Sequence, residues 1–333
     1  MNEITVVIPT FNRRKLLQNA IDSVLKETRV PIKVHIFDNA STDDTEHYVR
    51  TAAALDPRIF YFKNDYNCGA VENFARGLAS VSTTYYVPLA DDDWLLPNFL
   101  FDAFHILEEY RDAGAAIFVT EQRNEEGNIE TTYPSALDKI QFGLLKPSEH
   151  LRDWMTYGHY AWSSILWRSE TLKCIGAPYF HVGLPSDVDF QVQIFCDFSV
   201  YIVNRPGAVY RAHAEQASRG FDMSHLQSWA LLFKRLDRKV KNRRIIECRE
   251  YLKLREIMQR RYQWAWNSPS RFPLTDRQII AIATSAGLRL GDWDLAFSLL
   301  DQLKPLEFKM EIMRFYLKAV RAYCSLARRI RTW

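Results

Sequence analysis

The chain has 333 residues, of which 47% are hydrophobic and 25% are charged, and its formal net charge is +3 at pH 7. These values are typical of a globular protein with a sizeable core, and the length predicts about two domains. The small charge argues against a dedicated nucleic-acid binder, in which basic residues would be in clear excess.

The five cysteines are far apart and form no C-x-x-C pair, which argues against a zinc site or a disulfide framework and fits a reducing compartment. The first residues lack the basic and apolar regions of a signal peptide. No apolar stretch reaches the roughly 18 residues that a transmembrane helix needs. The sequence therefore predicts a cytoplasmic protein.

The first 120 residues alternate between strand patterns and helix patterns. Residues 4–8 form a continuous apolar run that ends at Pro9, as expected of a strand buried on both faces. Residues 15–28 carry apolar side chains at helical spacing. The alternation continues with predicted strands at 34–37, 59–62, 85–89 and 115–120, and predicted helices at 42–55, 70–81 and 99–110. This order predicts an α/β fold with a mostly parallel sheet and helices on both faces.

The rest of the chain is less regular. Residues 121–147 are polar and are predicted to form a loop, and residues 148–221 contain mixed short elements. From Met223 onward the pattern is helical and charged. The helix predicted at 42–55 has Ser41 or Thr42 as its expected cap.

Three consecutive aspartates, Asp91, Asp92 and Asp93 (the acidic run), follow the predicted strand at 85–89. Adjacent carboxylates repel one another, and a bound cation offsets that repulsion. Mg²⁺ prefers one or two carboxylates together with phosphate oxygens. Asp38 also follows a strand, and open parallel sheets bind ligands at these strand ends, so we expect one shared crevice. The alternative is a solvated acidic turn that caps the next helix.

Four segments within about 100 residues resemble family 2 glycosyltransferases of the GT-A fold, in the family's order. They are V-I-P-T-F-N-R (7–13), F-D-N-A-S-T-D-D-T (37–45), N-D-Y-N-C-G (64–69, continuing to Asn73 and Arg76) and L-A-D-D-D-W-L-L-P (89–97). The resemblance covers about residues 3–221. It implies a Rossmann-like sheet flanked by helices and a transfer, with inversion, from a nucleotide-sugar (a transferase of class EC 2.4). The helical C-terminal extension lies outside it.

The resemblance also implies which residues bind the nucleotide and the metal. The nucleotide-binding residues are Pro9, Thr10, Asn12, Asp38, Asn67 and Asp91, with uridine the favoured base. The ligands of Mn²⁺ or Mg²⁺ are Asp92, Asp93 and His213, although His213 could instead have a structural role. Ala90 stands where the family often has an acid, so the assignment within the acidic run stays open. The spacing to Pro97 favours Asp92, and a literal D-x-D pattern favours Asp91 and Asp93.

The segment P-S-D-V-D-F-Q (185–191) resembles the family's E-D-x-D helix start, with Ser186 in place of the glutamate. The resemblance implies that Asp187 is the catalytic base. In the first turn of a helix, the dipole would keep its carboxylate ionised. One alternative is a carboxylate with no catalytic role. The other is Asp189, which competes with Asp187 for this role but is more readily placed to orient Asp187 or the acceptor. Candidates for contacts with the phosphates or the acceptor are Arg76, Asp189, Arg211, Arg219, His159 and Trp162, of which Trp162 could equally be a core residue.

These observations predict a catalytic domain over 1–221, with a nucleotide-binding half at about 1–120 and an acceptor half at about 121–221, and a helical region over 222–333. Residues 309–333 form a predicted basic amphipathic helix, which either contacts an anionic membrane or packs on the catalytic domain. The resemblance implies a glycan or a lipid-linked glycan as acceptor, in bacterial surface polysaccharide or lipopolysaccharide synthesis. The expected location is the cytoplasm or the inner face of the cell membrane.

Three alternative functions compete with this interpretation. A nucleotidyltransferase also uses paired acids, but no glycine-rich phosphate loop bearing Lys or Arg follows the first strand. A dinucleotide dehydrogenase would need G-x-G-x-x-G where P-T-F-N stands at 9–12. A sugar-binding scaffold with a degenerate site is opposed by the acids at 38, 91–93 and 187.

Overall fold

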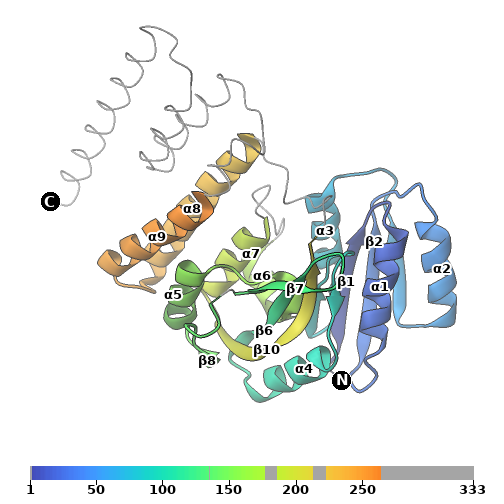
Figure 1. Cartoon of the computed structure of the whole chain (residues 1–333), viewed down its shortest axis with the longest axis horizontal. Coiled ribbons are helices and arrows are strands. Elements are labelled where there is room, and N and C mark those ends of the chain that lie inside the picture. The colour runs from blue at the N-terminus through green and yellow to red at the C-terminus, as the bar shows by residue number, and fades with distance from the viewer. Residues whose placement is uncertain (1, 135, 177–185, 213–222, 264–333) are drawn as a thin grey trace, which may run out of the picture.

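The computed structural model describes residues 2–134, 136–176, 186–212 and 223–263, and these residues form a three-layer α/β structure (Figure 1). One sheet has the strand order β3-β2-β1-β4-β9-β6-β10-β5, with β7 paired to β6 and β8 paired to β10. Its strands are β1 (Ile4–Thr10), β2 (Ile32–Asp38), β3 (Ile59–Lys63), β4 (Tyr85–Pro88), β5 (Trp94–Leu95), β6 (Ala113–Arg123), β7 (Ile129–Tyr133), β8 (Gly143–Leu145), β9 (Ile165–Arg168) and β10 (Ser199–Arg211).

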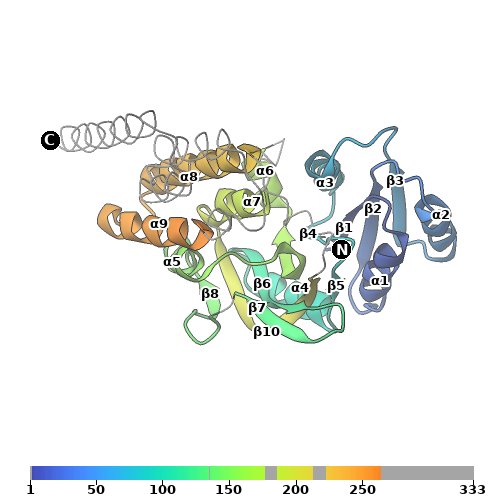
Figure 2. The ribbon, with the colours of Figure 1, turned by 45° about the horizontal axis from the view of Figure 1, so that its top comes forward.

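The helices cover both faces of this sheet. They are α1 (Arg14–Leu25), α2 (Thr45–Leu55), α3 (Ala70–Ala79), α4 (Phe99–Glu109), α5 (Pro147–Tyr157), α6 (Glu170–Ile175), α7 (Ser186–Phe195), α8 (Met223–Arg243) and α9 (Cys248–Gln263), with a short 3₁₀ turn η1 (Trp162–Ser164). Figure 2 shows α3 and α7 on one side of the sheet and α1 and α4 on the other. The α/β prediction is therefore confirmed.

Strand β1 lies at the centre of the parallel half of the sheet, where it pairs with β2 on one side and β4 on the other. The chain runs outward from β1 through β2 to β3, and then returns to the opposite side of β1 to form β4. This reversal is the topological switch point at which open α/β sheets bind ligands. The carboxyl ends of β1, β2 and β4 all meet at this edge.

Two hydrophobic cores lie on opposite faces of the sheet, because successive strand residues point to opposite sides. On one face, Ile4, Val6 and Ile8 of β1 belong to a core shared with α1, α2 and α4. On the other face, a second core joins α3, α5 and α7 to α8 and α9. The helices α8 and α9 therefore share a core with α3, α5 and α7 and are not separate from the rest of the fold.

Two predictions about local structure are wrong. Residues 121–147 are not a loop, because they contain the end of β6 as well as β7 and β8. The sequence pattern does not indicate β7, since this strand is partly exposed and rich in Thr and Glu. Helix α2 begins at Thr45, because Ser41 and Thr42 have other partners. Ser41 Oγ accepts a hydrogen bond from the backbone N–H of Asn12, and the Thr42 N–H donates to Asn12 Oδ1.

The C-terminal predictions are tested only in part. The helical pattern from Met223 is confirmed by α8 and α9. The predicted boundary at residue 221 and the predicted basic helix at 309–333 lie outside the described residues.

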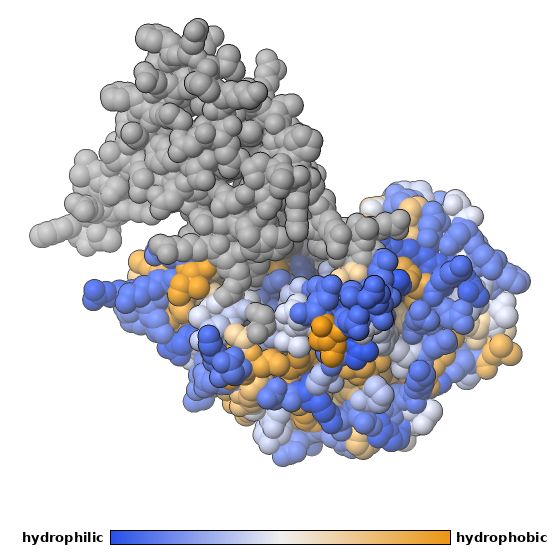
Figure 3. Space-filling view, viewed as in Figure 1, coloured by the Kyte–Doolittle hydropathy of each residue, from blue (hydrophilic) through white to orange (hydrophobic). Residues whose placement is uncertain are grey.

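In the part of the chain that the structure describes, none of the helices combines the length and apolar character needed to span a bilayer. Figure 3 shows hydrophilic residues over most of the visible surface near α1 and α2.

Candidate active site

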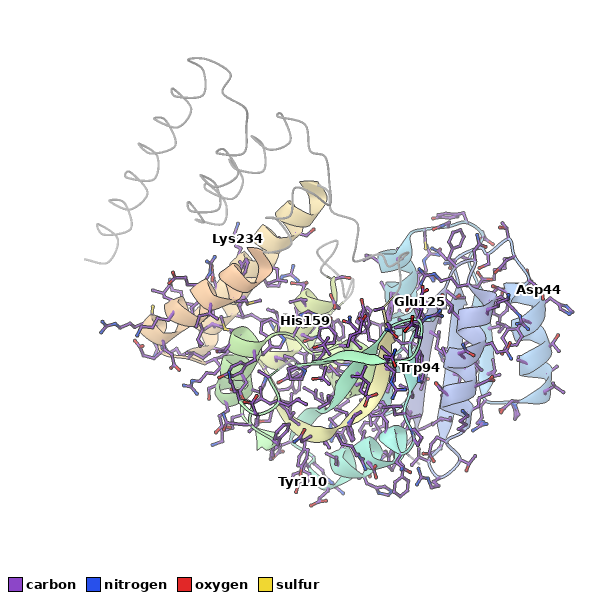
Figure 4. The ribbon with its side chains drawn as sticks, viewed as in Figure 1. Asp44, Trp94, Tyr110, Glu125, His159 and Lys234 are labelled. Carbon is purple, nitrogen blue, oxygen red and sulfur yellow. The ribbon has the colours of Figure 1, made fainter. Side chains whose placement is uncertain are left out.

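The acidic run lies in a tight turn between β4 and β5. The N–H of Leu89 donates to Val7 O at 2.9 Å, which continues the pairing of β4 with β1 up to the turn. The N–H of Asp93 then donates to Ala90 O at 3.1 Å and closes the turn. Trp94, labelled in Figure 4, begins β5, which pairs with β10. The three carboxylates are thus fixed on both sides by strands of the sheet.

Asp91 is held at the end of β1. Its Oδ2 accepts a hydrogen bond from Thr10 Oγ1 at 2.8 Å, and its Oδ1 lies 3.1 Å from a guanidinium nitrogen of Arg13. The residue is 6% exposed. Burial, and then the neighbouring charge of Asp92, raise the pKa of Asp91 to about 6.

Arg13 supplies a positive charge to the acidic run. The same guanidinium nitrogen, Nη1, contacts Asp91 Oδ1 and also Asp92 Oδ2, at 2.8 Å. Arg13 precedes α1 directly, and Asn12 before it has a positive φ of 54° that turns the chain there. From the sequence, Arg13 is a less certain candidate than Thr10 or Asp38 in the site. The sequence contains one signal for this contact. A basic residue follows the first strand, and three adjacent acids, which need a counter-charge, follow the fourth predicted strand.

Asp93 faces into the protein. It is 2% exposed, and Ser163 Oγ donates to its Oδ2 at 2.5 Å. The backbone N–H of Arg211 donates to its Oδ1 at 3.2 Å. Burial raises the pKa of Asp93 well above its usual range. These contacts tie the acidic run to η1 and β10, and the predicted role of Asp93 as a metal ligand stays a prediction.

The carboxylates of the acidic run fit a divalent cation whose coordination is completed by phosphate oxygens of a substrate. Among the described residues, no group of three or more His, Cys, Asp or Glu side chains could by itself hold an ion, and the predicted ligand His213 lies outside them. Mg²⁺ sites, however, are often built from one or two carboxylates completed by substrate phosphates. Asp92 suits this arrangement best, because its side chain is 14% exposed and that of Asp91 only 7%.

Asp38 ends β2 beside Thr10, its partner in the pairing of β1 with β2. Its Oδ1 accepts the N–H of Ser41 at 2.7 Å, and its Oδ2 accepts the hydroxyl of Tyr61 at 2.5 Å. Burial and this hydrogen bond raise the pKa of Tyr61 above its usual range. Thr10 therefore has Asp38 on one side and Asp91 on the other, as expected for two acids at one edge of the sheet.

A network of asparagines shapes the loops beside Asp38. Asn39 Nδ2 donates to Asn67 Oδ1 at 2.7 Å, and Asn64 Nδ2 donates to Asn73 Oδ1 at 2.8 Å. Asn73 Nδ2 in turn donates to the backbone of Phe37 at 2.8 Å. Asn67 thus has a structural partner, and the roles of Asn67, Asn12 and Pro9 in nucleotide binding stay predictions.

Asp187 lies in the first turn of α7 and is partly buried. Among the described residues, none makes a hydrogen bond or ion pair with its carboxylate. Asp189 is completely buried, and its carboxylate pairs with Arg235 of α8 at 2.9 Å. Its predicted contact with the phosphates or the acceptor stays a prediction.

The remaining predicted residues lie on several different elements. Trp162 packs on Phe74 of α3, with ring centroids 4.3 Å apart, which favours the core interpretation. His159, labelled in Figure 4, lies 6.0 Å from Tyr133 between ring centroids. Arg76 pairs with Glu72 on the exposed side of α3. Arg211 contributes its backbone to Asp93, and Arg219 lies outside the described residues.

Comparison with known proteins agrees with this geometry. Residues 5–167 match the family model described as "Glycosyl transferase family 2". A Campylobacter jejuni protein named GalNAc(5)-diNAcBac-PP-undecaprenol beta-1,3-glucosyltransferase is 31% identical over 150 residues, covering 45% of this chain and 46% of that protein. Abequosyltransferase RfbV of Salmonella typhimurium is 29% identical over 123 residues, which is 36% of each chain. The aligned region thus spans less than half the length of these relatives.

A solved structure shares the fold. Staphylococcus aureus TarS 1–349, in complex with UDP-GlcNAc, matches with a TM-score of 0.69 at 15% identity, covering 96% of this chain and 88% of that one. The layered sheet, its switch point and the carboxylates at that point together define a GT-A glycosyltransferase fold. Residues 5–167, just under half of the chain, match glycosyltransferase family 2.

Proposed function

We propose that this protein transfers a sugar from a nucleoside-diphosphate sugar to an acceptor hydroxyl, with inversion at the sugar. The observation that carries the proposal is the meeting of Thr10, Asp91, Asp92 and Arg13 at the switch point between β1 and β4. This is the edge at which sheets of this type bind nucleotides. The charged groups there come from two separate segments of the chain, the residues after β1 and the turn after β4, and converge on one small region.

The names of similar proteins support a nucleotide-sugar donor. TarS has been solved with UDP-GlcNAc and with UDP, and a Pyrobaculum calidifontis mannosyltransferase has been solved with GDP-Man and Mn²⁺. We infer a UDP-sugar donor and Mn²⁺ or Mg²⁺ as cofactor for this chain. The bound cation would neutralise the departing diphosphate, and Asp92 is the residue that we assign to hold it.

Asp187 is the residue that we assign to accept the proton of the attacking hydroxyl. Its position in the first turn of α7 favours the ionised form, because the positive end of the helix dipole lies there. A base in this role needs a lone pair that is not already used in the protein, and no described residue bonds to its carboxylate. Asp93 stays buried in this proposal and holds the acidic run against the acceptor half.

The acceptor that we propose is a glycan or lipid-linked glycan of a bacterial surface polysaccharide. The support comes from the Campylobacter relative, whose name describes a glucosyltransferase acting on an undecaprenol-linked saccharide, and from the Salmonella abequosyltransferase. A lipid-linked acceptor would place the protein at the inner face of the cell membrane as a peripheral protein. We assign donor binding to about residues 1–120 and acceptor binding to about residues 121–221.

The test is the turnover of UDP-, GDP- and dTDP-sugars with Mn²⁺, measured for the wild type and for single isosteric variants. Asp187→Asn should lower kcat by about 10²–10⁴-fold, the usual contribution of a general base. Asp92→Asn should lower it by a factor of at least about 10², because metal stabilisation of a leaving group contributes several kcal/mol.

Asp44→Asn is the matched control. Asp44, labelled in Figure 4, is an exposed aspartate directly before α2 and should be neutral when changed. The donor base is identified by thermal shift, because a ligand that binds only the native state raises its stability. Equal turnover in the wild type and both site variants would refute the assignments, and tight saccharide binding without turnover would favour a scaffold.

A further inference from the structure

A row of polar and charged side chains joins α7 to α8. Asp189 and Gln193 on α7, and Asp197 just beyond its end, are spaced by four residues and so share one helix face. The cationic residues of α8 that face them have the same spacing. They are Arg235, Lys239 and Arg243. We call these six residues the α7–α8 seam, and Figures 1 and 2 both show the two helices side by side.

The contacts run in register along the seam. An Arg235 guanidinium nitrogen lies 2.9 Å from Asp189 Oδ2, to which Gln193 Nε2 also donates at 3.0 Å. One turn further, Lys239 Nζ donates to the backbone oxygen of Gln193 and lies 2.8 Å from Asp197 Oδ2. At the end, Arg243 Nε lies 3.1 Å from Asp197 Oδ1. The order of the three cations along α8 thus follows the order of their partners, Asp189, Gln193 and Asp197.

The first pair of the seam is buried. Asp189 has no exposed surface, and the Arg235 side chain is 13% exposed. Buried ion pairs contribute little net stability compared with apolar residues of similar size, and their best-attested use is to fix one arrangement among several. Leu232 and Leu236 of α8 belong to the same hydrophobic core as residues of α7, and such apolar contacts are not directional. The ion pair adds a directional contact between the two helices.

We propose that the α7–α8 seam positions Asp187, with Arg235 as the positioning residue. This inference rests on the proposed function, in which Asp187 is the base. Asp187 and Asp189 lie in the same first turn of α7, where backbone N–H groups lack partners inside the helix. A clamp on Asp189 therefore fixes the turn that carries the base. The C-terminal helices then act in catalysis through the placement of α7, without touching the substrate.

The first experiment compares Arg235→Met with Lys234→Met, which changes an exposed neighbour on α8 that is labelled in Figure 4. Arg235→Met should lower kcat by about tenfold or more while the KM for the donor stays unchanged, because small misplacements of a reacting group can cost about 10²-fold. Arg235→Lys, which keeps the charge, should recover part of the loss. Lys234→Met should behave as the wild type.

A double variant separates positioning from general stability. In an Asp187→Asn background, Arg235→Met should cause no further loss of the residual turnover, since it acts through the base. An equal loss in both backgrounds would overturn the proposal and leave the seam a stabilising contact only. An unchanged kcat in Arg235→Met would overturn it as well.

Amide hydrogen exchange keeps the test independent of the proposed reaction. Arg235→Met should accelerate exchange in α7 relative to Lys234→Met, and unchanged exchange there would refute the clamp. If the wild type turns over no nucleotide-sugar, the proposed function fails, and the exchange data alone decide whether the seam holds α7. The two failures are therefore distinguishable.

Discussion

Arg13→Met tests whether the acidic run depends on an internal cation. The substitution removes the guanidinium but keeps an unbranched side chain in its place. In the wild type, one nitrogen of Arg13 lies 3.1 Å from Asp91 Oδ1 and 2.8 Å from Asp92 Oδ2. Without it, the two carboxylates and the buried Asp93 have lost their closest described counter-charge. We expect the native state to be destabilised in metal-free buffer.

The magnitude follows from distance and burial. At about 3 Å and an effective dielectric constant of about 20, each pair has a gross attraction of about 5 kcal/mol. Breaking a fully buried pair costs about 3–5 kcal/mol, and an exposed pair contributes about 0.2–1 kcal/mol. The Arg13 side chain is 28% exposed and the Asp91 side chain is 7% exposed, so the site is intermediate. We therefore expect a loss of about 2 kcal/mol in the free energy of unfolding.

The assay is urea unfolding of the wild type, Arg13→Met and Arg13→Lys, each with EDTA and with Mn²⁺. A cation present at one hundred times its Kd stabilises the native state by about 2.7 kcal/mol. If Arg13 and the metal serve the same carboxylates, Mn²⁺ should stabilise Arg13→Met more than the wild type. Arg13→Lys should lie between the two, because an ammonium group keeps the charge but cannot bridge both acids as well.

Two results would refute this reasoning. Equal unfolding free energies for the wild type and Arg13→Met in EDTA would show that the ion pairs contribute nothing to stability. A smaller effect of Mn²⁺ on Arg13→Met than on the wild type would show that Arg13 assists metal binding and does not share its ligands.

Three further predictions concern stability. Burial raises the pKa of Asp189 to about 6, so its carboxyl group binds a proton more tightly in the folded state than in the unfolded state. The free energy of unfolding should therefore fall by up to about 3 kcal/mol as the pH rises from about 4 to about 6. Asp189→Asn should flatten that slope in urea titrations, and an unchanged slope would contradict the shift. Gly77→Ala would place a Cβ 2.5 Å from Val7 Cγ1 and should cost about 1–3 kcal/mol, which chemical denaturation measures against the wild type. Ser163→Ala removes the 2.5 Å hydrogen bond to Asp93 and should lower the unfolding free energy by about 1–3 kcal/mol, whereas a neutral result would mean that another donor replaces it.

Much of the parallel half could be predicted from the sequence. Strands β1 to β4 and helices α1 and α3 lie within a few residues of their predicted positions, because their apolar residues have strong periodicity and Pro or Gly residues mark several of their ends. The strands β7 and β8 were missed, since short, partly exposed strands carry too few apolar residues to show a period. Their existence depends on pairing with β6 and β10.

The candidate site divides in the same way. That Asp38 and the acidic run would share one edge of the sheet followed from the order of strands and acids along the chain. The partners of these acids did not follow. Arg13 and Asp91 are 78 residues apart, and Ser163 and Asp93 are 70 residues apart.

The sequence by itself determined the alternation of strands and helices, and with it the placement of acids at the strand ends, because both depend on neighbours within a few residues. Only the tertiary structure decided that Asp92 is the more exposed acid of the acidic run and that Asp93 is buried. It also brought Asp189 against Arg235, 46 residues further along the chain. A carboxylate takes its role from the groups that surround it in space, and packing brings those groups from distant segments.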